Sequence, residues 1–319
     1  MSDSVRVAHP QPITLGPLLR TIVAHAVPGL EVCDVEARVH SKVVRDGEVI
    51  LDVAWDAPGV VTLSATGWSG PVAVDDGLVR LARRWLDLDR DVRAVDAHLG
   101  ASELLRPLVA ARPGLRVLGS TDGFETAVMT VLGQQVSLAA ARTFGARLVA
   151  GLGAPAPAGR RAFPGPGVLA ATDAEELRAL LGLTRARAAT VVGLSRAVAD
   201  GIVELEGGDP DDVRRALLAL SGIGPWTADY LALRVLGDRD AYPADDLVLK
   251  RALGVRTGRA AAALSNDWAP WRACAVTHLW TEAVYGSPDQ DGGQDRRLDA
   301  LPPPGHGQPP ATRGARRAM

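Results

Sequence analysis

Two adjacent carboxylates stand in the segment Tyr242-Pro243-Ala244-Asp245-Asp246, directly before an expected helix with the sequence LVLKRAL. One aspartate is enough to cap the start of that helix. The pattern therefore predicts that Asp245 is the cap and that Asp246 faces inward. A carboxylate in an interior pocket can stabilise a developing positive charge and can orient or deprotonate a water molecule.

Aromatic residues are concentrated in the same part of the chain. Of ten Trp and Tyr residues, seven lie in residues 226–285. Trp226 and Tyr230 are four residues apart, so they share one face of an expected helix. A carboxylate beside aromatic faces suits a flat, electron-poor ring whose glycosidic bond is to be broken. Core packing is the alternative interpretation, and it is the favoured one for Trp268 and Trp271.

The string LSGIGPWTA at residues 220–228 joins two expected amphipathic helices. Gly222 and Gly224 allow a tight turn with outward-pointing backbone N–H groups, and Ile223 between them can enter the core. The helix that begins at Pro225 adds the positive end of its dipole, so this turn is suited to bind a phosphate without reading a base. An ordinary αα-hairpin is the alternative, and the full string makes it the weaker one.

These features together resemble the helix–hairpin–helix (HhH-GPD) superfamily of DNA glycosylases. GIGPWTADYLALR together with YPADDLVLKRAL is similar to the AlkA-type DNA-3-methyladenine glycosylase II family. Residues 124–137 (FETAVMTVLGQQVS) resemble the first helix of that family's catalytic domain with its DNA-wedge turn, and residues 271–280 resemble its last helix. The resemblance covers about residues 14–285.

The resemblance implies a role for each matching residue. The catalytic carboxylate is Asp246, and the base pocket is formed by the aromatic residues Trp226, Tyr230 and Trp280. The DNA-binding residues are Gly222, Gly224 and Thr227 of the hairpin, with Gln135 as the wedge. The best-known relative has a leucine at the wedge position. A monovalent cation is implied at the backbone carbonyls of Leu218, Leu220 and Ile223.

The implied activity is the hydrolysis of the N-glycosidic bond of alkylated purines, of the 3-methyladenine and 7-methylguanine type, in double-stranded DNA. The damaged nucleotide must first rotate out of the duplex. The product is an abasic site. No cofactor is required beyond a structural cation, and a monomer is expected.

Two other functions are consistent with parts of the sequence. A bifunctional glycosylase/lyase of this superfamily carries a lysine in the turn after the second hairpin glycine, where this chain has Pro225-Trp226-Thr227. The nearest lysine is Lys250, four residues after Asp246, so a monofunctional enzyme is favoured. A non-catalytic DNA-binding module is the second alternative, because such hairpins also serve as phosphate grips. Asp246 and the aromatic residues argue against it.

Composition excludes several classes of site and protein. Two cysteines, Cys33 and Cys274, cannot hold a four-cysteine iron–sulfur cluster or a cysteine-rich zinc site. The net charge of -2 argues against a strongly basic DNA-coating protein. No apolar run approaches the roughly 18 residues that a membrane helix needs, and the first residues, MSDSVRVAHPQP, contain no apolar signal core. We expect a soluble cytoplasmic protein.

The first 115 residues predict an α+β module. An expected helix at residues 16–27 is followed by segments of alternating hydrophobicity at 30–44, 48–55 and 60–66, and by a second helix after Asp76-Gly77. An antiparallel sheet of three or more strands is therefore expected. The family resemblance implies that this module is TATA-binding-protein-like.

The pattern of residues 116–285 predicts a mainly α-helical domain. The family resemblance implies that this is the HhH-GPD catalytic domain, with two helical subdomains and the active-site cleft between them. Its first long helix is expected to break at Gly133-Gln134-Gln135. Thr172 and Glu175 predict a capping box at the start of a later helix. Residues 286–319 are rich in Gly, Pro and charge, which is typical of a disordered tail.

Overall fold

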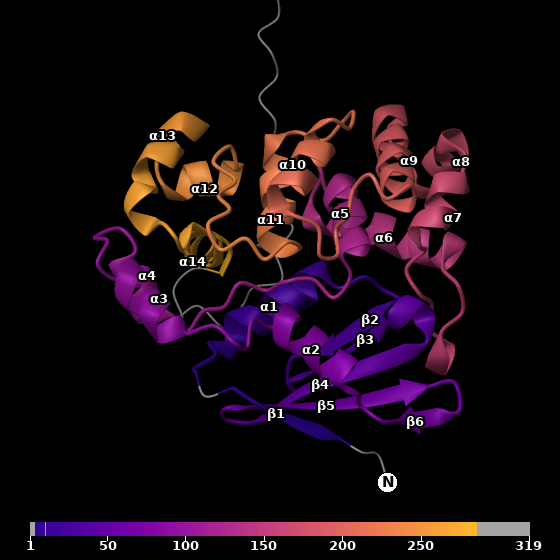
Figure 1. Cartoon of the computed structure of the whole chain (residues 1–319), viewed down its shortest axis with the longest axis horizontal. Coiled ribbons are helices and arrows are strands. Elements are labelled where there is room, and N and C mark those ends of the chain that lie inside the picture. The colour runs from indigo at the N-terminus through magenta and orange to yellow at the C-terminus, as the bar shows by residue number, and fades with distance from the viewer. Residues whose placement is uncertain (1–3, 10, 286–319) are drawn as a thin grey trace, which may run out of the picture.

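The computed structural model describes residues 4–9 and 11–285, so the expected tail at 286–319 lies outside the described residues. Within these ranges the strands form one six-stranded antiparallel sheet with the order β1-β5-β4-β3-β2, and β6 pairs with β5 (Figure 1). The antiparallel sheet is confirmed, and β1 and β6 add to the expected segments. The strands are β1 (Val5–Ala8), β2 (Glu31–Asp34), β3 (Val39–Val44), β4 (Val49–Ala57), β5 (Val60–Gly67) and β6 (Gly70–Val72).

Alternation along β4 explains how the sheet is covered. Leu51 and its alternating neighbours point to one face, where they pack with α1 (Leu15–His25) and α2 (Asp76–Trp85). Ile50 points to the opposite face and packs in a smaller cluster with Ala162 of a later loop. On this second face Asp52 and Ala54 are half-buried and Asp56 is exposed, so the loop covers only the start of the strand.

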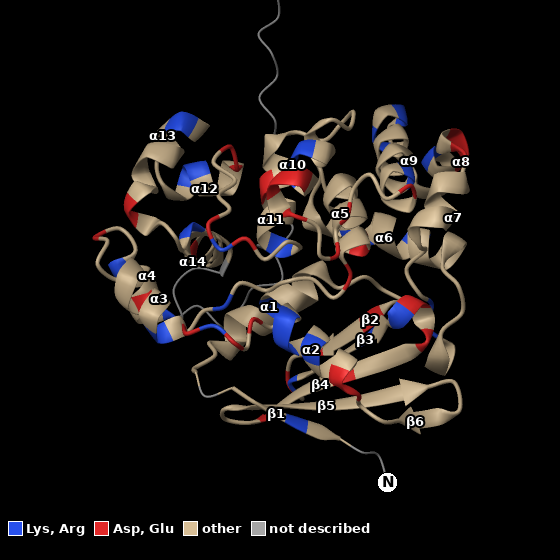
Figure 2. Ribbon diagram, in the orientation of Figure 1, with Lys and Arg blue, Asp and Glu red and all other residues tan. Residues whose placement is uncertain are grey.

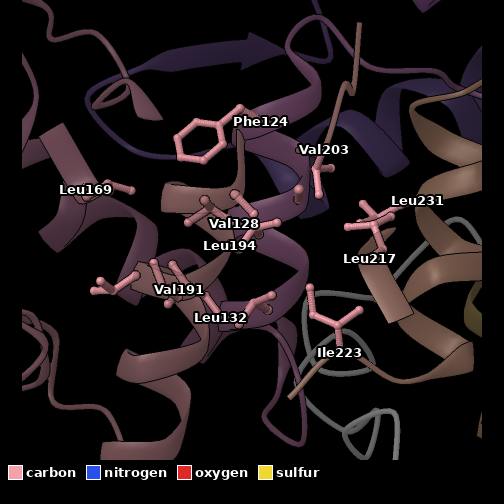
Figure 3. Close-up of a cluster of buried hydrophobic side chains, with 14 of the residues drawn as sticks. Phe124, Val128, Leu132, Leu169, Val191, Leu194, Val203, Leu217, Ile223 and Leu231 are labelled. Carbon is pink, nitrogen blue, oxygen red and sulfur yellow. The ribbon is translucent and has the colours of Figure 1, made fainter. Parts of the chain in front are cut away.

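A first group of helices surrounds the cluster of apolar side chains in Figure 3. Phe124, Val128 and Leu132 enter it from one helix, and Ile223 of the glycine-rich turn enters it from another direction (Figure 3). The expected break at residues 133–135 separates the first two helices. The group consists of α5 (Gly123–Leu132), α6 (Leu138–Leu152), α7 (Pro166–Ala171), α8 (Ala174–Leu181), α9 (Arg185–Ala199), α10 (Pro210–Leu218) and α11 (Pro225–Arg234).

A second group combines helices from distant parts of the chain. Trp268 is 2% exposed in its core, and the indole Nε1–H donates to Oγ of Ser102 at 3.2 Å. The group contains α3 (Val92–Leu99), α4 (Arg106–Ala111), α12 (Leu247–Ala252), α13 (Gly258–Leu264) and α14 (Arg272–Tyr285). Although α3 and α4 precede residue 116, they share this core with the C-terminal helices (Figure 1). No helix in residues 4–9 and 11–285 is long and apolar enough to cross a membrane.

The start of α8 differs from the expected capping box. The cap is Asp173, whose Oδ1 accepts the backbone N–H groups of Glu175 and Glu176 at 2.8 and 3.2 Å. The hydroxyl of Thr172 instead donates to the carbonyl of Val168 at 2.8 Å, in the helix that ends there. The prediction was wrong by one residue, because the neighbouring aspartate is an equally good cap and the threonine hydroxyl is already bonded.

Candidate active site

A cavity of about 330 Å³ lies between the sheet domain and the two groups of helices. Its walls come from α1 on the side of the sheet, from α5, α6 and α11 of the first group, and from α12 and α14 of the second. Figure 2 shows acidic and basic residues on the loops between the two groups of helices. Four of the residues singled out from the sequence line the cavity, namely Trp226, Tyr230, Asp246 and Trp280. The fold therefore brings together residues that the motif alone placed on three separate helices.

Asp246 is 4% exposed and is the N-cap of α12. Its Oδ1 accepts the backbone N–H of Leu249 at 2.7 Å and the indole Nε1–H of Trp280 at 3.0 Å. Its Oδ2 accepts the indole Nε1–H of Trp226 at 2.8 Å. Hydrogen bonds to an ionised acceptor are stronger than neutral ones, so the two indoles and the helix start hold this carboxylate in one orientation beside the cavity.

The predicted division of roles between the two aspartates is wrong. The side chain of Asp245 is 67% exposed, and its Oδ1 lies 3.7 Å from Nζ of Lys250 in an ion pair. A carboxylate has two oxygens with about four lone-pair sites. Asp246 can therefore cap the helix and face the cavity at the same time, and a second carboxylate is not needed for either task.

The aromatic residues form a continuous wall. The rings of Trp226 and Tyr230 stack with centroids 5.3 Å apart and an interplanar angle of 21°. Tyr230 in turn lies 5.9 Å from the ring of Trp280, at 45°. Trp268 is a core residue, as the packing alternative predicts, and Trp271 packs against that same core. A flat ring that entered the cavity would meet the faces and edges of Trp226, Tyr230 and Trp280.

The glycine-rich turn has the geometry that its sequence predicts. Gly222 adopts a left-handed conformation with φ of 86°, and a Cβ at this position would collide with the hydroxyl of Thr190. Gly224 is extended and starts α11, while Ile223 is 6% exposed in the core. Only glycine is suited to position 222, because of this φ and this close contact. The turn thus presents its backbone at the surface, next to the positive end of α11.

The three residues implied in cation binding lie on this same short stretch. Leu218 ends α10, and Leu220 and Ile223 follow within the turn. The carbonyl of Leu220 accepts the N–H of Ile223 at 3.2 Å, which closes the turn. A carbonyl oxygen has two lone pairs, so the carbonyl of Leu220 keeps one lone pair beside this hydrogen bond. No group of three or more His, Cys, Asp or Glu side chains in the described part of the chain is arranged to hold a metal ion.

The expected wedge lies in the loop between α5 and α6, next to the hairpin. Gln135 is exposed and has a left-handed φ of 56°. Its neighbour Gln134 was not singled out from the sequence. The Nε2 amide of Gln134 donates to the carbonyl of Gly222 and to the hydroxyl of Thr227, each at 3.1 Å. Thr227 is fully buried, backbone included, so the structure does not present this residue to DNA, and its hydroxyl instead holds the loop that contains Gln134.

The sheet domain contributes a buried charge cluster that the sequence reasoning missed. Nζ of Lys42, on β3, lies 2.7 Å from Oε1 of Glu125 on α5 and 3.6 Å from Oε1 of Glu31. Nε2 of His40 lies 2.8 Å from the other oxygen of Glu31. Lys42, Glu31 and Glu125 line the cavity. Charged residues are almost never buried unless they are paired, but sequence spacing does not reveal a partner 83 positions away.

The two carboxylates of this cluster titrate in opposite directions. Burial alone would raise the pKa of Glu31, but Lys42, His40 and the backbone N–H of Val27 outweigh it and hold this pKa at about 2. Burial and the negative charge of Glu31 raise the pKa of Glu125 to about 7, although Lys42 opposes the shift. Lys42, His40 and the N–H of Val27 all stabilise the ionised form of Glu31, whereas Glu125 has only Lys42, which it shares with Glu31. Glu125 is therefore protonated at a higher pH than Glu31.

Comparisons with known proteins agree with this arrangement. Residues 4–122 match the AlkA N-terminal domain, and residues 128–258 match the HhH-GPD superfamily base excision DNA repair protein. The DNA-3-methyladenine glycosylase 2 of Escherichia coli is 36% identical over 219 residues, which are 66% of this chain and 72% of that protein. The probable bifunctional transcriptional activator/DNA repair enzyme AlkA of Mycobacterium tuberculosis is 43% identical over 208 residues, 62% of this chain. The chain spans 41% of the length of that relative.

A solved structure shares the whole fold. The 3-methyladenine DNA-glycosylase from Archaeoglobus fulgidus superposes with a TM-score of 0.76 at 20% identity, and the match covers 89% of this chain and 99% of that one. Both the sheet domain and the helical groups take part in so extensive a match. The family domains, the relative in Escherichia coli and the shared fold together show that this chain belongs to the HhH-GPD superfamily of base excision DNA repair proteins, in its AlkA-type branch.

Proposed function

We propose that this chain is a monofunctional DNA glycosylase of base excision repair. It hydrolyses the N-glycosidic bond of alkylated purines of the 3-methyladenine and 7-methylguanine type and leaves an abasic site. The observation that carries the proposal is the carboxylate of Asp246, held by the indoles of Trp226 and Trp280 at the wall of a base-sized cavity. The relative in Escherichia coli is a DNA-3-methyladenine glycosylase, which supports the same class of substrate.

Selection of the damaged base begins with its charge. Alkylation at a ring nitrogen makes a purine cationic, and a cation is attracted to the face of Trp or Tyr. The wall formed by Trp226, Tyr230 and Trp280 offers such faces beside Asp246. Rotation of the nucleotide out of the stack requires a few kcal/mol, and less when the lesion pairs badly. The cavity therefore favours bases that are both loosely paired and positively charged.

The chemical step needs little more than a fixed negative charge. When the bond between the sugar and the base breaks, its electron pair leaves with the cationic base, which becomes neutral, and the sugar gains oxocarbenium character. Asp246 stabilises this positive charge and accepts a proton from the water that attacks the sugar carbon. The base needs no protonation to leave, so a general acid is not required.

Double-stranded DNA is held through its phosphates by the turn at Gly222–Gly224 and the start of α11. Gln135 fills the space that the rotated nucleotide leaves in the duplex. A monovalent cation on the carbonyls of Leu218, Leu220 and Ile223 adds positive charge at this contact. The chain acts as a monomer at the chromosome, in the cytoplasm.

Release of bases from methylated DNA tests the function. DNA treated with a methylating agent is incubated with the protein, and the released bases are separated by chromatography. We expect 3-methyladenine and 7-methylguanine in the soluble fraction and intact strands until the abasic sites are cleaved by alkali. Binding of DNA without any release would favour the non-catalytic phosphate grip and would overturn the proposal.

The product should be an abasic site and not a nicked strand. The turn Gly224–Thr227 contains no lysine, Lys250 is paired with Asp245, and Lys42 is paired with Glu125. Neither amine is presented as a free nucleophile. Reduction with borohydride during the reaction should therefore give no covalent protein–DNA adduct. Efficient trapping that disappears in Lys250→Ala would show instead that Lys250 forms a Schiff base.

A further inference from the structure

His25 is the last residue of α1, and its side chain lines the cavity that contains Asp246, Trp226 and Trp280. Figure 1 shows α1 between the sheet and the helices, so His25 reaches the cavity from the sheet domain. No step of the proposed hydrolysis uses this residue. It brings a polar ring to the cavity from α1, whereas Asp246 enters from the start of α12.

A hydrogen bond fixes the tautomer of this ring. Nδ1 of His25 lies 2.8 Å from the carbonyl oxygen of Thr21, one helical turn back. A carbonyl can only accept, so Nδ1 carries the hydrogen and donates. In the neutral ring the other nitrogen, Nε2, then has a lone pair and no hydrogen. Because Nδ1 faces back along α1, Nε2 lies on the side of the ring that is directed away from that helix.

The surroundings of the ring keep it neutral. Although the residue is exposed to solvent, desolvation by the surrounding protein and the positive charges of Arg234 and Arg142 lower the pKa of His25 to about 4. The hydrogen bond to Thr21 and the charge of Glu31 oppose this shift without reversing it. Arg234 is itself held at the cavity by Tyr230, whose hydroxyl accepts from its Nη1 at 3.2 Å. At neutral pH the cavity therefore contains an uncharged hydrogen-bond acceptor.

We propose that His25 is a specificity-determining residue whose Nε2 accepts a hydrogen bond from the 6-amino group of an adenine-type base. This inference rests on the proposed function. The bond to be broken must lie at Asp246, and position 6 of a purine is on the far side of the ring system from the glycosidic nitrogen. A base that stacks on the aromatic wall thus directs its 6-substituent away from Asp246, and in our proposal this substituent meets His25 where α1 lines the cavity.

The 6-substituent distinguishes the two kinds of cationic purine. Adenine carries an amino group, which donates, and guanine carries a carbonyl oxygen, which accepts. Nε2 of His25 therefore accepts a hydrogen bond from the adenine amino group and repels the guanine carbonyl oxygen. Charge and stacking are similar for 3-methyladenine and 7-methylguanine, so they cannot supply this discrimination. A polar group such as Nε2 of His25 can discriminate between the two bases, because it is hydrogen-bonded with one and left unpaired with the other.

The test compares both lesions in one reaction with methylated DNA under single-turnover conditions, so that the ratio of the two release rates does not depend on enzyme concentration. In His25→Leu, release of 3-methyladenine should fall about 3- to 10-fold relative to 7-methylguanine, as expected for one lost hydrogen bond. His25→Arg replaces the acceptor by donors. It should lower the ratio further and increase the release of 7-methylguanine itself.

His98→Leu is the matched control, because His98 is exposed in the last turn of α3 and does not line the cavity. Its ratio should equal that of the unaltered protein. An unchanged ratio in His25→Leu, or equal losses for both lesions, would overturn the assignment of His25 and leave the glycosylase activity standing. Failure of the unaltered protein to release either base would overturn the proposed function itself.

Discussion

Replacing Asp246 by asparagine is expected to lower the rate of base release at least about 100-fold, the size of effect seen when one preorganised electrostatic group is removed from an active site. Asparagine keeps one oxygen that can accept the N–H of Leu249, so α12 retains its cap. It loses the negative charge that stabilises the sugar cation. Single-turnover excision of 3-methyladenine measures the loss, and DNA binding, measured separately, should persist.

The same substitution should also reduce stability. With the asparagine oxygen on the N–H of Leu249, its amide nitrogen would face the indole N–H of Trp226, and two donors cannot bond each other. An unsatisfied buried donor costs about 1–3 kcal/mol. Asp245→Asn is the matched control, because this exposed side chain lacks the contacts of Asp246, and its unfolding free energy should change by about 0.5 kcal/mol or less. Equal loss of activity in both variants without unfolding would contradict the assignment.

A large loss of stability is expected when Lys42 is replaced by methionine. The side chain of Lys42 is 11% exposed, and its ammonium is shared by Glu31 and Glu125. Removing one partner of a buried ion pair costs about 3–5 kcal/mol, because a charge stays buried without compensation. Urea unfolding followed by far-ultraviolet circular dichroism measures this change in the unfolding free energy.

A double variant distinguishes uncompensated charge from lost packing. Lys42→Met combined with Glu125→Leu removes both charges of the shorter pair and should recover part of the lost stability. A double variant as unstable as the sum of two independent losses would mean that Lys42 and Glu125 are not energetically coupled, and would contradict the role of their charges.

Acid titration gives an independent measure of the cluster. Because the pKa of Glu31 is about 2 in the folded protein and 4.5 without perturbation, its contribution to stability is present above pH 4.5 and is lost as the pH falls toward 2. Lys42→Met removes a main cause of that shift. The unfolding free energy of the variant should therefore depend less steeply on pH between these limits.

Local patterns in the sequence predicted the parts of the site that a short stretch of chain determines. The turn at Gly222–Gly224 and the helix after it follow from residue types a few positions apart. The shared face of Trp226 and Tyr230 follows from helical spacing. The strands that alternate in hydrophobicity were also found, whereas β1 and β6 contain only four and three residues and are too short for alternation to be recognised.

The errors arose where one residue has two partners or where the partner is distant. Asp246 is both the helix cap and the cavity carboxylate, because its two oxygens accept hydrogen bonds from different sides. The prediction assumed one task for each aspartate and therefore assigned the cap to Asp245. The helical spacing of residues 16–27 predicted α1 but not which of its side chains would reach a second domain, so His25 was missed. The pairing of Lys42 with Glu125 likewise depends on how the sheet docks on α5.

The composition of the second helical group has a consequence for the order of folding during synthesis. α3 and α4 leave the ribosome early, but the indole of Trp268 that bonds Ser102 is made 166 residues later. Contacts between distant segments form slowly, because a long loop must close first. The sheet and the first helical group can assemble while the chain is still growing. The wall of the cavity that contains Asp246 and Trp280 can be completed only when nearly the whole described chain has been made, so we expect a nascent chain that ends before α14 to lack the complete site.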